Sequence, residues 1–580
     1  MKFKNLFPVW DKKKTIITSL FLAAAVLIAV LIGALNITVT ANVSGREYSV
    51  DNIVSHVYAI SKEEHSVFSA EENQAAVRNY ITSTLDGYGI ESEVIKHREV
   101  SIYDEKNETF PKYSPVNIYA EISGTSGTDV LLICHYDSCP YKEKYGEASE
   151  GSHGAIDDGY GVSVVLELAR IYSQAEGLKN GIKLAFVDAE EVGCYGSEAL
   201  VNERTGWLEN VNLVLNVESR GETGPVYMFQ TSPNNRKLIE FYNHAGFPYT
   251  FSLAAQIYDM MPNDTDLSPF IEHGYHGLNI ATLDSLKTYH NEKDVFDSID
   301  ESTFSKYCDT LLPLLDEYAL NEKYSDINWF DCQSDALFFT LFPNAMVLYD
   351  KVVGWVFFGI TLAAVIALIV VLVLKKKINF VKAAISLAID IGLLAVICGL
   401  GFIVALLSCA CCGVNYHLIF VIGVPGDAAV LIAFGILAIA AVVASTLLKR
   451  KLNITYTEMT AGALVLYSLL CIVCAAALFG GSFAFVIPAL LIVICAWFTF
   501  IKNDKLRASL MGATAGVAAL FTLSFSVALI YSVYVSLTFG ALGFMLVLFA
   551  LPFTLILPPE FGFYGEEKSA VKAEKGVESV

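Results

Sequence analysis

The stretch GIKLAFVDAEEVGCYGSEAL, residues 181–200, decides the fold of the middle part of this chain. It begins with a short, mostly apolar run typical of a buried strand, and it ends in a segment with helical spacing. Between the two stand adjacent carboxylates, Glu190 and Glu191, which repel each other and are costly to bury. The stretch therefore predicts a strand whose carboxyl end carries acidic side chains with a purpose other than packing.

The same pattern recurs on both sides of this stretch. DVLLICHYD (129–137) precedes a segment with helical spacing at 161–175, and VNLVLNVES (211–219) follows another. Strands that alternate with helices predict an α/β fold with a mixed, mainly parallel sheet flanked by helices. Since the carboxyl ends of parallel strands meet at one edge, His135 and Glu218 are expected to lie near the Glu190–Glu191 pair.

The composition of the whole chain is that of a membrane protein. Hydrophobic residues make up 54% of the 580 residues and charged residues only 17%. Apolar runs of the roughly 20 residues needed to cross a bilayer occur at 15–37, at 352–374 and repeatedly up to 557, about eight in all. The chain is therefore predicted to combine the α/β domain with an all-α multi-span transmembrane domain.

Basic residues cluster at alternate ends of the predicted spans, at 1–14, 375–377, 449–451 and 502–507. Such ends are cytoplasmic by the positive-inside rule. The predicted organisation is a cytoplasmic basic N-terminus (1–14), a transmembrane anchor (15–37), an extracytoplasmic domain (42–340), a seven-span transmembrane domain (352–557) and a cytoplasmic acidic tail (558–580).

Two further readings follow from composition. The first apolar run could instead be a signal peptide, because Val39-Thr40-Ala41 resembles a cleavage site. Its apolar core is longer than the h-region of a signal peptide, which favours an uncleaved anchor. The formal net charge of −21 excludes nucleic acid as a partner, because phosphate binding needs basic patches. Membrane lipid is the expected surrounding of the spans, and the oligomeric state is left open.

The cysteines and the ionisable residues of the predicted spans are interpreted as structural residues. The twelve cysteines show no disulfide framework, although a Cys308–Cys332 pair is possible. The group Cys409, Cys411 and Cys412 is read as small apolar packing. Asp390 is the ionisable residue well inside a predicted span, and this scarcity favours an anchoring role over transport.

Histidines and carboxylates follow the predicted strands in a way that suggests a metal site. Each alone has an ordinary reading as a loop residue or a helix cap. Nine of the ten histidines precede residue 291, so chemistry that depends on histidine is expected in the extracytoplasmic domain. Zinc accepts mixed imidazole and carboxylate ligands better than magnesium or calcium, and two zinc ions would make adjacent acids tolerable.

Five motifs occur in one order: HYD (135–137), AIDDGYG (155–161), DAEEVGCYGSEAL (188–200), NVES (216–219) and YHNEKD (289–294). Together they resemble the M28 family of zinc peptidases over roughly residues 50–320. A single anchor, a peptidase domain and a multi-span region are similar to the membrane-bound branch of that family. The resemblance implies a zinc aminopeptidase-like fold, two zinc ions as cofactors and a peptide or protein substrate.

The resemblance also implies roles for individual residues. Glu190 is the general base, and Asp137 is a carboxylate that orients the imidazole of a zinc ligand. Asp157 bridges the two ions, and Asp158 follows it in the turn. The full implied ligand set is His135, Asp157, Glu191, Glu218 and His290.

Three positions differ from the commonest pattern of the family. Cys194 stands where Leu is frequent and is expected to alter packing alone. Glu218 replaces a frequent Asp, and Asn291 follows the last histidine where Thr is common. None of these differences removes an implied ligand.

The function expected from the sequence is a membrane-anchored di-zinc metallopeptidase, an aminopeptidase in the first place. Two alternatives stay open: a single-zinc enzyme resembling glutaminyl cyclases, and a non-catalytic membrane scaffold or receptor with a peptidase-like domain. The segment PNDTDLSPF (262–270) is placed either near the substrate cleft or in a turn that caps a helix.

Overall fold

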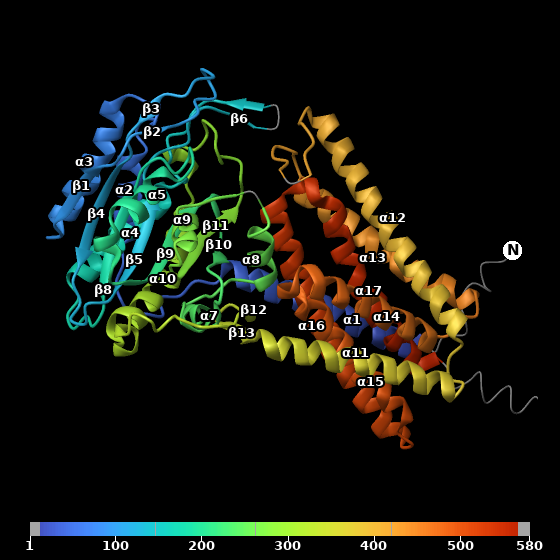
Figure 1. Ribbon diagram of the computed structural model, residues 1–580. Coiled ribbons are helices and arrows are strands. Elements are labelled where there is room, and N and C mark those ends of the chain that lie inside the picture. The colour runs from blue at the N-terminus through green and yellow to red at the C-terminus, as the bar shows by residue number, and fades with distance from the viewer. Residues whose placement is uncertain (1–11, 145–146, 262, 419, 566–580) are drawn as a thin grey trace, which may run out of the picture. The chain divides into compact units, whose positions relative to one another are not determined.

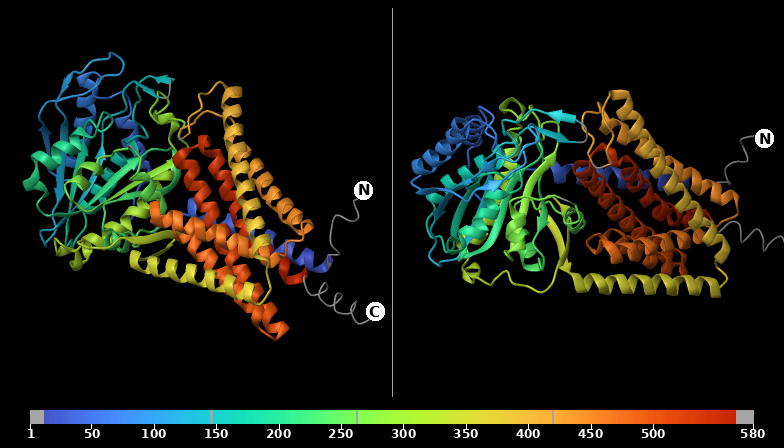
Figure 2. Two further views of the ribbon diagram at one scale, coloured as in Figure 1. Left: turned by 45° about the vertical axis from the view of Figure 1, so that its right-hand side comes forward. Right: turned by 45° about the horizontal axis from the view of Figure 1, so that its top comes forward.

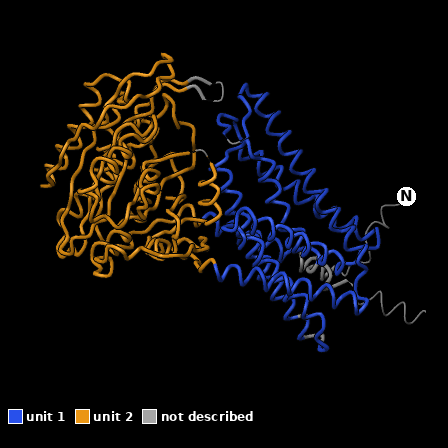
Figure 3. Tube along the Cα trace, viewed as in Figure 1, with its two compact units in different colours: residues 1–34, 352–580 blue, residues 35–351 orange. Residues whose placement is uncertain are grey.

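The computed structural model describes residues 12–144, 147–261, 263–418 and 420–565. The chain divides into two compact units, which Figure 3 colours separately. The α/β unit comprises residues 35–351, and the helical unit comprises residues 1–34 together with 352–580. Much of the predicted basic N-terminus (residues 1–11) and of the predicted acidic tail (residues 566–580) lies outside the described residues.

A seven-stranded mixed sheet forms the centre of the α/β unit (Figure 1). Its strands, in spatial order, are β1 (Ser92–Lys96), β4 (Val116–Ile122), β8 (Gly181–Val187), β5 (Asp129–His135), β9 (Val211–Ser219), β11 (Gly277–Asp284) and β10 (Thr223–Thr231). The four strands β8, β5, β9 and β11 are parallel to one another. Strands β1, β4 and β10 pair antiparallel at the two edges. The predicted mixed sheet is confirmed, with its parallel part in the middle.

The sheet is covered by helices on both faces (Figures 1 and 2). Successive side chains of a strand point to opposite faces, so Leu132 and Cys134 of β5 join one core while Leu131 and Ile133 join the other. The larger core contains residues of α2 (Val50–Ile60), α3 (Glu71–Gly87), α4 (Gly159–Ser173), α7 (Arg236–Tyr242), α8 (Ser252–Tyr258) and α10 (Ser302–Leu320). The smaller core contains residues of α5 (Tyr195–Glu203), α6 (Thr205–Leu208) and α9 (Leu267–Glu272).

Three short hairpins complete the α/β unit. They pair β2 (Val100–Ser101) with β3 (Lys112–Tyr113), β6 (Lys142–Lys144) with β7 (Glu147–Ser149), and β12 (Ala336–Phe342) with β13 (Ala345–Asp350). The second hairpin is the one that matters for the site, because its first residue is Lys142.

Among the described residues, eight helical segments of the helical unit are long and apolar enough to cross a membrane, the number expected from the sequence. They are α1 (Lys12–Thr38), α11 (Lys351–Leu374), α12 (Phe380–Cys412), α13 (Asp427–Lys451), α14 (Tyr456–Ala477), α15 (Phe483–Trp497), α16 (Asp504–Leu537) and α17 (Leu542–Gly565). Their buried apolar residues form a core of their own.

Asp390, the acidic residue predicted within a span, forms a buried ion pair between α12 and α13. Its Oδ1 lies 2.5 Å from Nζ of Lys449, and the two side chains are 2% and 3% exposed. Lys449 is one of the three basic residues at 449–451. One charge of this cluster is therefore paired inside the helical unit. The pair explains how an acidic side chain is tolerated at this depth.

Removing either member of this pair is expected to destabilise the helical unit. Asp390→Asn would leave the Lys449 ammonium buried without a counter-charge, at a cost of about 3–5 kcal/mol. The measurement is thermal unfolding of the full chain in detergent. A double variant, Asp390→Leu with Lys449→Met, removes both charges and should recover most of the loss. A single variant as stable as the wild type would contradict this role.

All twelve cysteines are free thiols. The Cys308–Cys332 disulfide that the sequence left possible is therefore not formed, and Cys308 is buried in α10 while Cys332 is partly exposed. Cys409 packs inside the helical unit, but Cys411 and Cys412 are exposed, so packing accounts only for the first of these three.

Candidate metal centre

The parallel strands bring polar side chains to one edge of the sheet. His135 is the last residue of β5, Glu190 and Glu191 follow β8, and Glu218 is the penultimate residue of β9. Ligand sites of open α/β sheets lie beyond the carboxyl ends of such strands. The candidate site occupies that position in the α/β unit.

Asp157 lies between two imidazoles. Its Oδ1 is 3.3 Å from Nε2 of His135, and its Oδ2 is 3.3 Å from Nε2 of His290. Each carboxylate oxygen therefore faces a different histidine. Together, the two imidazoles hold the pKa of Asp157 below its ordinary value in spite of burial.

The loop before α4 fixes Asp157 in this place. Asp158 is the N-cap of α4, and its Oδ1 accepts the Gly161 N–H at 3.0 Å. A side chain on Gly161 would collide with the Asp158 carboxylate and with the Val217 carbonyl, which explains the glycine of the DDGYG sequence. Asp157 thus faces the site while Asp158 caps the helix.

Glu191 approaches His290 from the neighbouring strand. Its Oε2 lies 3.2 Å from Nε2 of His290 and 3.1 Å from Nζ of Lys142. The side chain of Glu191 is 1% exposed, and its other oxygen, Oε1, has no hydrogen-bond partner among the described residues. Burial lowers the pKa of His290, so this imidazole is held in its neutral, metal-binding form.

Asp137 organises the site through two kinds of contact. Its main-chain carbonyl lies 3.0 Å from Nδ1 of His135, while its carboxylate is 3.5 Å from the same nitrogen. The carboxylate also accepts the main-chain N–H groups of Glu190 at 3.1 Å and Glu191 at 3.3 Å. Asp137 therefore orients both the imidazole and the backbone of the glutamate pair.

Carboxylates lie close to His135 and change the pKa of its imidazole. Burial opposes protonation of the imidazole, yet the adjacent carboxylates of Asp137 and Asp157 raise the pKa of His135 well above its ordinary value. A metal cation placed among these carboxylates would take over the role of that proton.

Glu190 sits beside this cluster without an ion pair among the described residues. Burial raises the pKa of Glu190 well above its ordinary value, and Glu218 and Glu191 raise it further. The Cys194 thiol lies 3.7 Å from Oε1 of Glu190, so Cys194 contacts the expected base and does more than alter packing.

Glu218 is held by a residue of its own strand and by a tyrosine of α10. The Asn216 amide donates to Oε1 of Glu218 at 3.0 Å, and the Tyr307 hydroxyl donates to its main-chain carbonyl. Burial raises the pKa of Glu218 to about 8, partly offset by the charge of His135. No ion pair joins Glu218 to His135 within the described part of the chain.

Several residues of the site were not predicted from the sequence. Asp294 is buried and accepts the main-chain N–H groups of Ile156 at 2.7 Å and Asp157 at 3.3 Å, which holds the Asp157 loop. Its position in the YHNEKD motif was the available signal. Asp266, from the 262–270 segment, is fully buried, and burial raises its pKa to about 7. Its charge acts on Glu190 and Glu218, which favours the cleft reading of that segment.

Left-handed backbone conformations occur at three non-glycine residues around the site. They are Ala189 (φ 61°), Cys194 (φ 54°) and His290 (φ 55°). Such conformations are uncommon outside glycine and persist where the surrounding structure imposes them. Ala189 and Cys194 lie on either side of the glutamate pair in the sequence, and His290 itself adopts this conformation.

The chain is similar to known proteins over the α/β region. The family model of Peptidase family M28 matches residues 117–315. The vacuolar membrane protease of Clavispora lusitaniae is 25% identical over 311 residues, which cover 50% of this chain and 28% of that protein. The human endoplasmic reticulum metallopeptidase 1 is 25% identical over 245 residues, 41% of this chain and 26% of that protein. The chain thus spans little more than a quarter of the length of these relatives.

Solved structures similar to part of this chain include two enzymes. A Zn-dependent exopeptidase from Parabacteroides distasonis aligns with a TM-score of 0.36 and 19% identity over 46% of this chain and 97% of its own. A glutaminyl cyclase from Porphyromonas gingivalis aligns with a TM-score of 0.37 and 21% identity over 47% of this chain and 99% of its own. The segment 117–315 thus matches the model of Peptidase family M28, in a chain whose described residues include eight candidate membrane spans.

Proposed function

We propose that this chain is a membrane-anchored di-zinc metallopeptidase that hydrolyses peptide bonds, with aminopeptidase activity as its first expected form. The observation that carries the proposal is the pair of 3.3 Å contacts from the two Asp157 oxygens to His135 and His290. A carboxylate between two imidazoles is suited to bridge two metal ions, one beside each histidine.

The donor groups fit zinc. When Nδ1 of His135 donates to the Asp137 carbonyl, Nε2 is left free to bind a metal, and such second contacts are usual for metal-bound histidines. Oε1 of Glu191 and Nδ1 of His290 are buried and lack partners among the described residues. One ion would be held by His135, Asp157 and Glu218, and the other by His290, Asp157 and Glu191.

The bound ions would polarise the scissile carbonyl and make a water molecule more acidic. Glu190 would accept the proton of that water and deliver it to the leaving amine. Asp137 acts as a positioning residue, because its carboxylate fixes the main chain of both glutamates. Burial raises the pKa of Glu190, which makes its carboxylate a stronger base.

The proposed topology follows from the basic clusters. With the ends of the spans at 1–14, 375–377, 449–451 and 502–507 in the cytoplasm, the peptidase domain (42–340) faces the outside or a lumen. Its substrates are then peptides or proteins on that side, and lipid surrounds the helical unit. A membrane-impermeant peptide added to sealed vesicles of known orientation tests the side.

A single-zinc activity like that of glutaminyl cyclases is the second candidate. One observation favours it: the ligand atoms of Cys139, Glu191 and His290 lie within 4.8 Å of one another, whereas Glu218 makes no ion pair with His135 in the described chain. The ligand groups around His290 are thus closer together than those around His135, which would favour one zinc ion on the His290 side.

One experiment separates these functions. Zinc per chain is measured on the full-length protein in detergent, and products from a peptide mixture are identified by mass spectrometry. We expect two zinc ions and zinc-dependent loss of N-terminal residues. One zinc with cyclised N-terminal glutamine would favour the second candidate, and bound zinc with no product of either kind would leave only a scaffold.

A further inference from the structure

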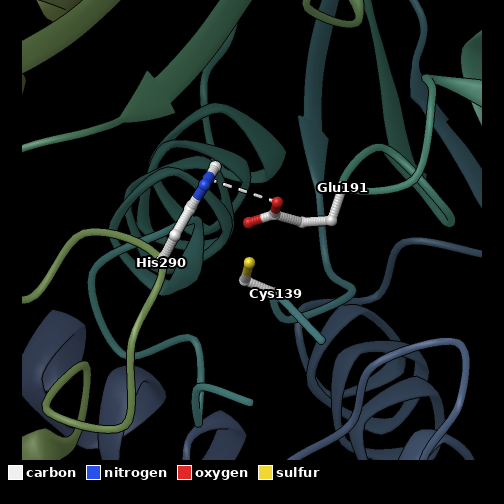
Figure 4. Close-up of side chains that lie close together, drawn as sticks. All are labelled: Cys139, Glu191 and His290. Atoms are coloured by element: carbon white, nitrogen blue, oxygen red, sulfur yellow. Dashed lines mark ion pairs between the residues drawn. The ribbon is translucent and has the colours of Figure 1, made fainter. Parts of the chain in front are cut away.

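Cys139 lies at the metal centre although no motif pointed to it. It follows β5 by four residues, whereas Glu191 follows β8 and His290 follows β11. Figure 4 shows the three side chains turned toward one another. One ligand atom from each lies within 4.8 Å of the other two. Zinc binds sulfur at about 2.3 Å and nitrogen or oxygen at about 2.0 Å, so two ligand atoms of one ion lie at most about 4.3 Å apart. Small side-chain movements would bring these three atoms onto one ion.

The surroundings of Cys139 leave its sulfur available. The side chain is fully buried, its thiol donates weakly to the Pro140 carbonyl at 3.5 Å, and it lies close enough to interact with the Glu191 carboxylate. A neighbouring polar atom, Oε1 of Glu191, is buried without a partner among the described residues. Unpaired donors and acceptors in a dry site are costly, so a ligand that binds them is expected.

Lys142 supplies the charge that an additional anionic ligand requires. Its Nζ lies 3.1 Å from Oε2 of Glu191 and 2.7 Å from the main-chain carbonyl of the same residue. A zinc ion deprotonates the thiol that coordinates it, so Lys142 would offset part of the negative charge that the sulfur adds.

We propose that Cys139 is a metal-ligating residue, which adds a thiolate to the donors of His290, Asp157 and Glu191 on the His290 side. This inference rests on the proposed function, since it requires a metal ion at that position. Thiolate ligands select zinc over magnesium, calcium and manganese, so Cys139 would also set the metal preference of the site.

Cobalt(II) reports on the ligand directly. The full-length protein in detergent is depleted of metal and loaded with cobalt, and its near-ultraviolet absorption is recorded. A thiolate bound to cobalt gives an intense charge-transfer band, which imidazole and carboxylate ligands do not give. We expect this band in the wild type and its loss in Cys139→Ser and Cys139→Val. The affinity for one of the two ions should fall at least about tenfold.

Cys194→Ser is the matched control. Cys194 is also buried and contacts a glutamate of the pair, at 3.7 Å from Glu190, but it does not belong to the group with His290. The band should persist in this variant. Two bound cobalt ions without a band in the wild type, or a band that survives in both Cys139 variants, would overturn the role of Cys139 and leave the peptidase proposal intact. Failure to bind any metal would overturn both.

Discussion

Glu190→Gln is expected to abolish most of the peptide hydrolysis while the zinc content stays at the wild-type value. The amide cannot accept a proton, and loss of a positioned general base costs about 10²–10⁴-fold in rate. The substitution keeps the size of the side chain, and its main-chain N–H still donates to Asp137. The measurement is kcat on a peptide substrate together with zinc per chain by elemental analysis.

Glu191→Gln is the control on the adjacent residue. Glu191 contacts His290 at 3.2 Å and Lys142 at 3.1 Å, so loss of its charge is expected to lower zinc content and activity together. The two variants thus separate metal binding from proton transfer in one dipeptide. Wild-type turnover in Glu190→Gln, or equal zinc loss in both variants, would show that the two carboxylates do not have different roles.

The fold was predictable where hydrophobic periodicity is local. The apolar runs predicted β5, β8 and β9. The strands β4, β10 and β11 were not predicted. The order of strands in the sheet follows from tertiary pairing, such as β11 beside β9, across sequence separations that carry no periodic signal.

The site was predictable where side chains directly follow strands or stand in recognisable motifs. His135, Asp157, Glu191 and His290 were named from the sequence, and the structure brings them together. Asp294 contacts a residue 137 positions away in the sequence, and Lys142 contacts one 49 positions away. Local sequence patterns do not predict such contacts. Cys139 looked like an ordinary loop cysteine for the same reason, because nothing near it in sequence reveals that His290 will face it.

Asp157→Asn should have the second large effect. The amide replaces one carboxylate oxygen with a nitrogen that donates hydrogen bonds, and it removes the charge that His135 and His290 share. A bridging ligand binds both ions, so the affinity for each zinc ion should fall by about 10–100-fold or more. Hydrolysis should be lost together with the bound zinc. Zinc per chain after dialysis against a weak chelator is the measurement.

Asp158→Asn provides the contrast, because Asp158 is the next residue and is also buried. Its oxygen caps α4 by accepting the Gly161 N–H, and asparagine caps a helix about as well as aspartate. Zinc content should therefore be unchanged in this variant. Asp158→Ala should lower the free energy of unfolding by about 0.5–2 kcal/mol, the usual cost of a lost cap. If Asp157→Asn retained both ions, or if Asp158→Asn lost as much zinc as Asp157→Asn, Asp157 would not be the bridge. The loop would then contribute only its overall negative charge.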